Sequence, residues 1–491
     1  MIMVLAVANS VHMLVSFIFD LRHNVTKVAA LKESLRINLV PIFLTSITTM
    51  IGFLGMNFNE SEPYRDLGNL VAVGVFASLV FSLTFLPAMM SFLPVKVKQG
   101  EDSAVPYLER FSRFSIKFHR PLLLLMCVVA IMSAAAIPLN TSEEHFTTYF
   151  DHTVQFRVDS DATLDIMGGT FQLTYSVPAA SKGGVSEPEY LKNLKKFADW
   201  YRQQPETINV FVFTDTMQRL NKNMHGDEPT WYKLPESRDL AAQYTLLYEM
   251  SLPYGLDLNN QVNVDKSATR VVVTVKDMTN NELMALEERV QAWLKSNVPS
   301  TMVTLGTGTL VMFSHLADTN TTSMIVGSVL ALIVISAILM FALRSFKMGL
   351  FSLVTNILPA AVGFGLWGVL NGEVHMGLSV VVSMTLGIVV DDSVHFLSKY
   401  LRAKREKGYS TEDSITYAFT HVGKALGIST LVLIGGFGVL MASHFAMTTD
   451  MALLTVWIIL AALAANFLFL PGLLLVFDKE KIVNNAVKVS E

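Results

Sequence analysis

The segment Leu386-Gly-Ile-Val-Val-Asp-Asp-Ser-Val-His-Phe-Leu397 places two adjacent carboxylates, Asp391 and Asp392, inside an apolar run that begins near Met376. On a helix, His395 lies four residues after Asp391 and three after Asp392, so these side chains can face a common partner or cavity. An acid at mid-bilayer depth costs about 2.5–3.5 kcal/mol on insertion scales, and such acids usually line an ion or proton path. The segment therefore predicts a membrane helix with a functional acidic pair.

An alternative is that the span ends early and leaves both acids in the cytoplasmic headgroup layer. The next basic residue, Lys399, lies two turns beyond the acids, and the apolar Phe396 and Leu397 lie between them. This spacing favours the position inside the membrane.

The composition is that of an integral membrane protein. The chain has 491 residues, of which 52% are hydrophobic and only 16% charged, which is too apolar for soluble domains of this length. A formal net charge of -4 gives no indication of nucleic-acid binding. The single cysteine, Cys127, excludes an internal disulfide framework and any multi-cysteine metal site.

Nine apolar runs are long enough to cross a bilayer, which takes about 17–25 residues. They cover approximately 1 to 19, 37 to 56, 67 to 93, 121 to 139, 323 to 343, 348 to 370, 376 to 398, 424 to 443 and 451 to 477. The first run has no Lys or Arg before Arg22, so it lacks the basic start of a signal peptide. Every second loop is rich in Lys and Arg, which predicts an N-terminus outside and a C-terminus in the cytoplasm.

A polar stretch of about 180 residues between the fourth and fifth runs has the pattern of a folded α+β domain, and the loop charges place it outside the cytoplasm. Alternation predicts strands at 171–177, 209–213, 270–275 and 302–305, and apolar spacing predicts helices at 187–204 and 280–295. Two strand-helix-strand units of this size suggest split βαβ, ferredoxin-like layers. The predicted fold class is therefore a polytopic α-helical membrane protein with one extracytoplasmic ferredoxin-like domain.

The chain also contains an internal repeat. Ser10-Val-His12 matches Ser393-Val-His395 at an offset of 383, whereas Gly52-Phe53 and Phe85-Leu-Pro87 match Gly436-Phe437 and Phe469-Leu-Pro471 at an offset of 384. An offset held over three spans is typical of the duplicated halves of transporters. If the two halves are equal, roughly 260 residues of the first half are absent, and the chain is expected to be truncated at its N-terminus.

These features define the expected domains. They are the last three spans of a first transmembrane repeat (1–93), a cytoplasmic linker (94–120), the first span of the second repeat (121–139), the outside domain (140–322), a five-span bundle (323–478) and a cytoplasmic tail (479–491).

The sequence resembles the resistance-nodulation-division (RND) superfamily. The resemblance rests on the Asp391-Asp392-Ser-Val-His395 motif after Gly387, the Gly-Phe in the next span, the Phe-Leu-Pro of the last span, and the large domain after the first helix of a half. It is strongest to the branch of MMPL and hopanoid-exporter proteins, with spans 323–478 similar to a sterol-sensing unit. The resemblance covers the entire chain and makes the outside domain a porter domain.

The resemblance implies proton-coupled export of lipids or other hydrophobic and amphiphilic molecules from a bacterial inner membrane. It assigns the proton relay to Asp391 and Asp392, and poor solvation by lipid gives the same role independently, because a poorly solvated acid can exchange a proton near neutral pH. His395 is expected to relay the proton or to pair with Asp391. Ser429 and Thr430 on the next span are possible hydrogen-bond partners, or they bond to their own helix carbonyls. In the first repeat, Ala8 and Asn9 replace the acids.

The competing hypothesis is a lipid-sensing or regulatory membrane protein, or a half-porter that does not pump by itself. A pure sensor needs no buried acids, so the Asp pair favours the transporter. An enzyme is not expected, because the sequence has no metal-spaced constellation, no phosphate-binding glycine loop and no nucleophile elbow. The expected partners are membrane lipid or an amphiphilic substrate, protons, and a missing N-terminal half or a second copy. No cofactor and no nucleic acid are expected.

Overall fold

The computed structural model describes residues 2–23, 25–95, 97, 104–142, 146–253 and 257–478. The chain divides into two compact units, one formed by residues 1–141 and 319–491 and the other by residues 142–318. Residues 98–103 of the expected linker and the expected tail, 479–491, lie outside the described residues.

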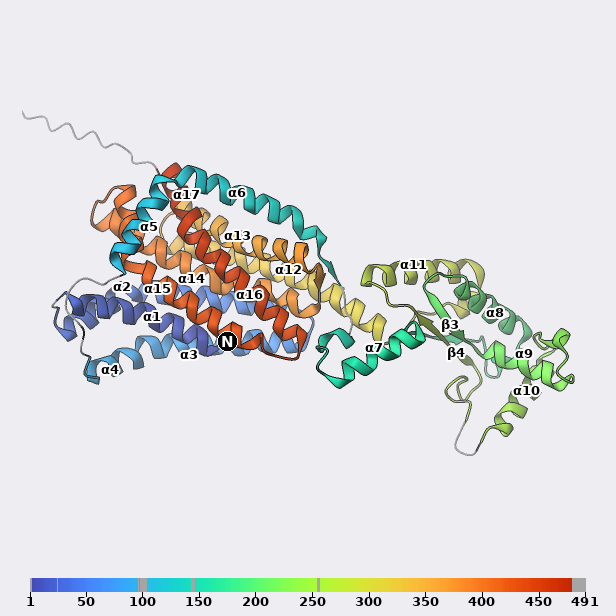
Figure 1. Cartoon of the computed structure of the whole chain (residues 1–491). Coiled ribbons are helices and arrows are strands. Elements are labelled where there is room, and N and C mark those ends of the chain that lie inside the picture. Colours follow the sequence, from blue (N-terminus) through green and yellow to red (C-terminus); the bar gives the residue numbers. More distant parts are fainter. Residues whose placement is uncertain are drawn as a thin grey trace, which may run out of the picture. The chain divides into compact units, whose positions relative to one another are not determined.

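The first unit is a bundle of long apolar helices (Figure 1). Its helices are α1 (Ile2–Arg22), α2 (Lys27–Leu54), α3 (Glu62–Leu83), α4 (Phe85–Phe92), α5 (Val105–Lys117), α6 (His119–Ala136), α12 (Thr309–Ala342), α13 (Phe346–Leu370), α14 (Met376–Glu406), α15 (Thr411–Leu440), α16 (Ala446–Ala464) and α17 (Leu470–Phe477). Short strands β1 (Thr141–Ser142) and β5 (Glu373–Val374) accompany them. Within the described residues, nine segments are long and apolar enough to cross a membrane, which confirms the predicted number of spans.

Helix α14, which carries the Asp391-Asp392 motif, is the most enclosed of these spans. Of its membrane-crossing segment, 89% is buried, against 6% in α6, which lies along the outer side of the bundle next to α13 (Figure 1). Two glycines bring α2 against α14, because a Cβ built on Gly52 would lie 2.9 Å from the Cα of Gly387. Thr49 Oγ1 donates a 2.8 Å hydrogen bond to the Gly387 carbonyl at the same crossing. Small residues thus fix the backbone of α14 one turn before Asp391.

The internal repeat has a structural counterpart in two broken spans. Helix α3 ends at Leu83 and α4 begins at Phe85, and in the second copy a π-helical segment, Ala465–Phe469, separates α16 from α17. Pro87 and Pro471 follow the two breaks at matching positions. Proline lacks an N–H and crowds the preceding turn, so both copies interrupt the helix at the same depth.

Helix α5 lies in the stretch that the sequence assigned to a linker. Ser112 Oγ lies 3.0 Å from Thr416 Oγ1 of α15, and Ser115 Oγ donates a 3.0 Å hydrogen bond to the Phe467 carbonyl. The part of this connection that the structure describes is therefore a helix packed on the bundle.

The second unit is built on a small antiparallel sheet. Its elements are α7 (Gln155–Met167), β2 (Phe171–Pro178), α8 (Pro188–Arg202), β3 (Thr207–Phe211), α9 (Phe213–Met224), α10 (Arg238–Ser251), β4 (Ala268–Val275) and α11 (Asn280–Asn297). The strand order is β2-β4-β3, with Tyr175 opposite Val271 and Val210 opposite Val273. Alternate residues of β2 and β4 are buried with apolar residues of α8 and α11, which makes one core.

The predicted strand at 302–305 is wrong. Residues Ser300–Met302 form a 3₁₀ turn, and the chain next pairs with β2 only at an isolated bridge between Thr174 and Thr307. With this bridge counted as a fourth strand beside β2, the sheet order is Thr307-β2-β4-β3. This is the order of two interleaved split βαβ units, so the domain is ferredoxin-like with its fourth strand reduced to a single residue pair. Gly308, with φ of 147°, follows the bridge and turns the chain into α12, which prevents further pairing.

Candidate functional site

Asp391 and His395 lie one turn apart on α14 and face each other inside the bundle. The distance from Asp391 Oδ1 to His395 Nε2 is 3.4 Å, and the side chains are 14% and 0% exposed. The sequence spacing predicted this approach, since residues four apart on a helix are neighbours. The pair lies on the enclosed helix α14.

A third group, His12 of α1, completes the cluster. Its ring stacks on that of His395 with a centroid distance of 3.7 Å and an interplanar angle of 8°. His12 is the repeat counterpart of His395, so each copy contributes one imidazole to the same place. The sequence did not predict His12 as a site residue, because only the acids were compared between the two repeats. The matched Ser-Val-His triplets were the sequence signal for this histidine.

Four polar atoms of this cluster have no partner among the described residues at good hydrogen-bond geometry. They are His12 Nε2, both ring nitrogens of His395, and Asp391 Oδ1, of which His395 Nε2 and Asp391 Oδ1 face each other at 3.4 Å. Buried polar atoms are normally hydrogen-bonded, so such a concentration marks a site that exchanges protons or admits water. A cavity of about 20 Å³ adjoins Asp391 and is lined also by Asn9 and Thr49. Its size allows about one water molecule.

The three side chains bring one potential metal-ligand atom each within 4.8 Å of one another. An imidazole binds a metal through a lone pair in the plane of its ring. Because the two rings are nearly parallel and stacked, an ion shared by both would lie well out of both ring planes. The geometry therefore suits proton exchange rather than metal coordination.

The remaining predicted relay residues make no hydrogen bond or ion pair with this cluster among the described contacts. Asp392 is 7% exposed and makes no hydrogen bond or ion pair with any described residue. Ser429 Oγ donates to the Leu426 carbonyl of its own helix at 3.0 Å, and Thr430 Oγ1 is buried without a hydrogen-bond partner in the part of the chain that the structure describes. Among the described contacts, only Asp391 and His395 of the five predicted residues meet directly.

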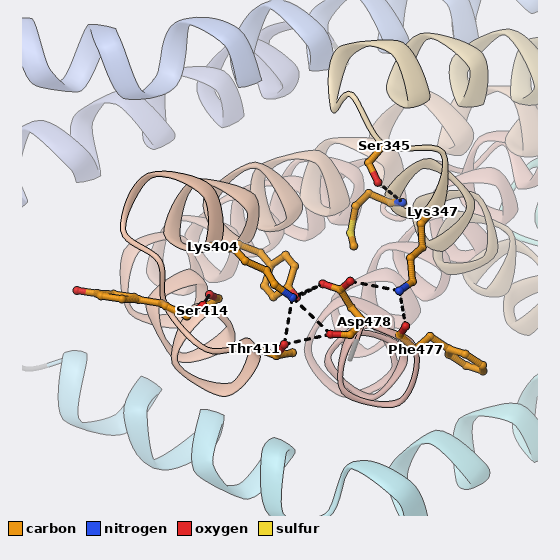
Figure 2. Close-up of polar contacts among 10 residues, drawn as sticks. Ser345, Lys347, Lys404, Thr411, Ser414, Phe477 and Asp478 are labelled. Carbon is orange, nitrogen blue, oxygen red and sulfur yellow. Dashed lines mark hydrogen bonds and ion pairs between the residues drawn. The ribbon is translucent and has the colours of Figure 1, made fainter. Parts of the chain in front are cut away.

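A second polar cluster, centred on Asp478, connects several helices at one end of the bundle (Figure 2). The Asp478 carboxylate accepts from Lys404 Nζ at 2.7 Å, from Tyr400 OH at 2.5 Å and from Lys347 Nζ at 3.2 Å. Thr411 Oγ1 donates to its carbonyl at 3.1 Å. Burial alone would raise the pKa of Asp478, but the hydrogen bonds from Lys404 and Tyr400 outweigh it and hold this pKa below its usual range. These contacts join the ends of α13, α14, α15 and α17, which gives the cluster a structural role.

Comparison with known proteins agrees with this architecture. Residues 257–488 match the model of the MMPL family. No curated protein sequence matches the chain significantly. Among solved structures, the hedgehog release protein Disp from the water bear Hypsibius dujardini is 13% identical, with a TM-score of 0.65 over 97% of this chain and 62% of that one.

The translocon-associated membrane protein SecDF from Thermus thermophilus is 12% identical, with a TM-score of 0.54 over 97% of this chain and 54% of that one. A SecDF structure in the super-membrane-facing form is 14% identical, with a TM-score of 0.52 and the same shares of each chain. The chain thus spans between 54% and 62% of the length of these proteins and shares their polytopic membrane fold. The resemblance to MMPL proteins seen in the sequence is confirmed over residues 257–488, and the chain is a multi-pass membrane protein that shares its fold with these structures.

Proposed function

We propose that this chain carries out proton-coupled export of lipid-like or amphiphilic molecules, with the cluster of His12, Asp391 and His395 as its proton-binding site. The observation that carries the proposal is the stacked histidine pair beside a carboxylate, enclosed at the centre of a membrane bundle and poor in hydrogen bonds. A structural ion pair at this depth would be expected to have its polar atoms satisfied.

Electrostatics limit what the cluster can hold. Two imidazolium rings 3.7 Å apart would repel each other by about 4–5 kcal/mol at an effective dielectric constant of about 20. The pair therefore shares one proton at a time, and the Asp391 carboxylate stabilises the charged form. Uptake and release of that proton change the charge where α1 and α14 meet. A conformational change that favours one charge state would then couple proton movement to transport.

The fold leaves the substrate open. Disp is named for hedgehog release and SecDF for its association with a translocon, so a shared fold does not identify the substrate. An amphiphilic substrate, a bacterial inner-membrane location, an outside N-terminus and a partner or second copy that supplies further porter elements are part of this proposal.

Reconstituted vesicles provide the test. The protein is placed in liposomes with a fluorescent phospholipid analogue and an internal pH dye, and an imposed pH gradient drives transport. Asp391→Asn is expected to abolish both lipid movement and the coupled pH change. Asp450→Asn is the matched control, because Asp450 sits in another span and pairs with His375 away from the cluster.

Undiminished transport by Asp391→Asn would refute the proton-site assignment. Lipid movement in the wild type without any pH change would refute proton coupling. Lipid binding without movement, in the wild type, would favour the lipid-sensing hypothesis instead.

A further inference from the structure

A cavity of about 330 Å³ lies at the end of the bundle where α14 finishes, among residues of α1, α2, α5, α14 and α15. Its charged lining is mostly basic. Lys399, Arg402, Lys407 and Lys424 face it, together with the carboxylates of Asp20 and Glu33. Glu33 is already engaged by Arg402 at 3.2 Å and by Arg36 at 2.8 Å, so an excess of positive charge remains.

The inner end of this cavity comes within one helical turn of the histidine pair. Ser16 and Lys399 both line it, and they follow His12 and His395 by four residues on their respective helices. Ser16 Oγ donates to the His12 carbonyl at 3.0 Å. The cavity and the proposed proton site are therefore neighbours on two helices at once.

Asn38 of α2 connects these lining groups. Its Nδ2 donates to Ser16 Oγ at 2.9 Å and to the His12 carbonyl at 3.5 Å. Its Oδ1 accepts from Lys399 Nζ at 3.5 Å. Lys399 is only 4% exposed, and this long contact is the only hydrogen bond that its ammonium group makes to a described residue. A buried ammonium group with so few protein partners requires water or an anion beside it.

The opposite side of the cluster is closed. There the cavity beside Asp391 has a volume of only about 20 Å³, and most of its lining is apolar, including Leu5, Val75 and Leu433. The cluster thus lies between two cavities. The one on the α14 C-terminal side is large and has a mainly basic charged lining, and the one on the other side has room for about one water molecule.

We propose that the larger cavity is the aqueous access route to the His12, Asp391 and His395 cluster, that the structure is the state open toward the α14 C-terminal end, and that Lys399 controls the entry of cations into the route. When protonated, Lys399 places a positive charge between the cavity and the cluster, where it opposes the entry of any cation, including a proton carried along a water chain. This inference rests on the proposed function, since it describes how protons reach that site.

Cysteine accessibility tests the route without measuring transport. Cys127 is the only cysteine, so Cys127→Ser provides a thiol-free background. Ser16→Cys reports the inner end of the cavity, Ala8→Cys reports the closed side, and the exposed Glu412→Cys marks the face on which α15 begins. Membrane-impermeant anionic and cationic thiosulfonates are added to either face of reconstituted vesicles.

We expect Ser16→Cys to react from the face that labels Glu412→Cys, and Ala8→Cys to react from neither face. Labelling of Ser16→Cys from the opposite face, or from neither while Glu412→Cys reacts, would overturn the route. If the route is labelled but Asp391→Asn transports normally, the proposed function fails while the access route stands.

The role of Lys399 is tested on the same reporter. Removing this charge near the reacting thiol, by Lys399→Met, should raise the rate of the cationic reagent relative to the anionic one by roughly thirtyfold, because such a charge contributes about 1 kcal/mol of opposite sign to the two reagents at partly screened distances. Lys399→Arg keeps the charge and should keep the wild-type ratio. An unchanged ratio in Lys399→Met would show that Lys399 does not control cation access.

Discussion

The close crossing of α2 and α14 predicts that a Gly→Ala substitution has opposite effects on stability at Gly52, which lies in the crossing, and at Gly435, which does not. Gly52→Ala adds a methyl group 2.9 Å from the Cα of Gly387, where backbone must move to admit it. Gly435→Ala adds the same methyl group to α15, where no atom of another described residue lies within 4 Å. Both changes gain about 1 kcal/mol of helix propensity, so the difference between them isolates the clash.

The size of the difference follows from overpacking. Forcing a methyl group into a filled interior typically costs about 1–3 kcal/mol, so Gly52→Ala should be less stable than Gly435→Ala by that amount. An unfolding entropy of about 2.1 cal/mol/K per residue gives about 1 °C per kcal/mol for a chain of 491 residues, so the melting temperatures should differ by about 1–3 °C.

Cys127 provides the assay. It is the only thiol and is partly buried, so a thiol-reactive fluorogenic dye reports unfolding of the purified protein in detergent. Equal melting temperatures for the two variants, or a less stable Gly435→Ala, would refute the proposed close packing. Because Thr49 and Gly387 adjoin the turn before Asp391, Gly52→Ala should also lower transport, whereas Gly435→Ala should not.

Three further predictions concern the proton site, the Asp478 cluster and the topology. His12→Phe keeps an aromatic ring against His395 but removes the second titratable group, so the protein should remain folded while proton-driven lipid movement falls at least tenfold; full activity would exclude His12 from the site. Asp478→Asn should destabilise the protein at neutral pH by about 1–2 kcal/mol, because the amide loses charged hydrogen bonds from Lys404 and Tyr400. Since the folded pKa of Asp478 is lowered, its contribution is complete above the unfolded value of about 3.9 and is lost as the pH falls through the folded pKa, so tryptophan-fluorescence melts of variant and wild type should converge in acid; a constant gap would contradict this. Reporter fusions after Gly226 and after Gly408 should lie in different compartments, and the same compartment for both would overturn the nine-span topology.

Local features of the sequence were enough to predict the number of spans and the approach of Asp391 to His395. Span length, apolar content and helical spacing are properties of neighbouring residues, and a helix of fixed pitch converts them directly into geometry. The same rules located α8, α11 and three of the four strands of the second unit. The prediction of a fourth strand at 302–305 was wrong because an edge strand depends on its pairing partner as well as on its own alternation. Here the 3₁₀ turn at 300–302 and the turn at Gly308 leave room for only one bridge.

The composition of the candidate site was decided by tertiary structure. Asp391 and Asp392 are adjacent and chemically identical, yet only Asp391 faces the histidines, because the rotation of α14 is set by its packing against α2 at Gly52 and Gly387. The Ser429 hydroxyl donates its hydrogen bond to a carbonyl of its own helix, and sequence spacing could not predict this choice of partner. His12 reaches His395 across 383 residues of sequence, and such a contact exists only after the two repeats have packed together. The sequence by itself determined which groups lie within the membrane, whereas the packing of helices distant in the chain decided which of them meet.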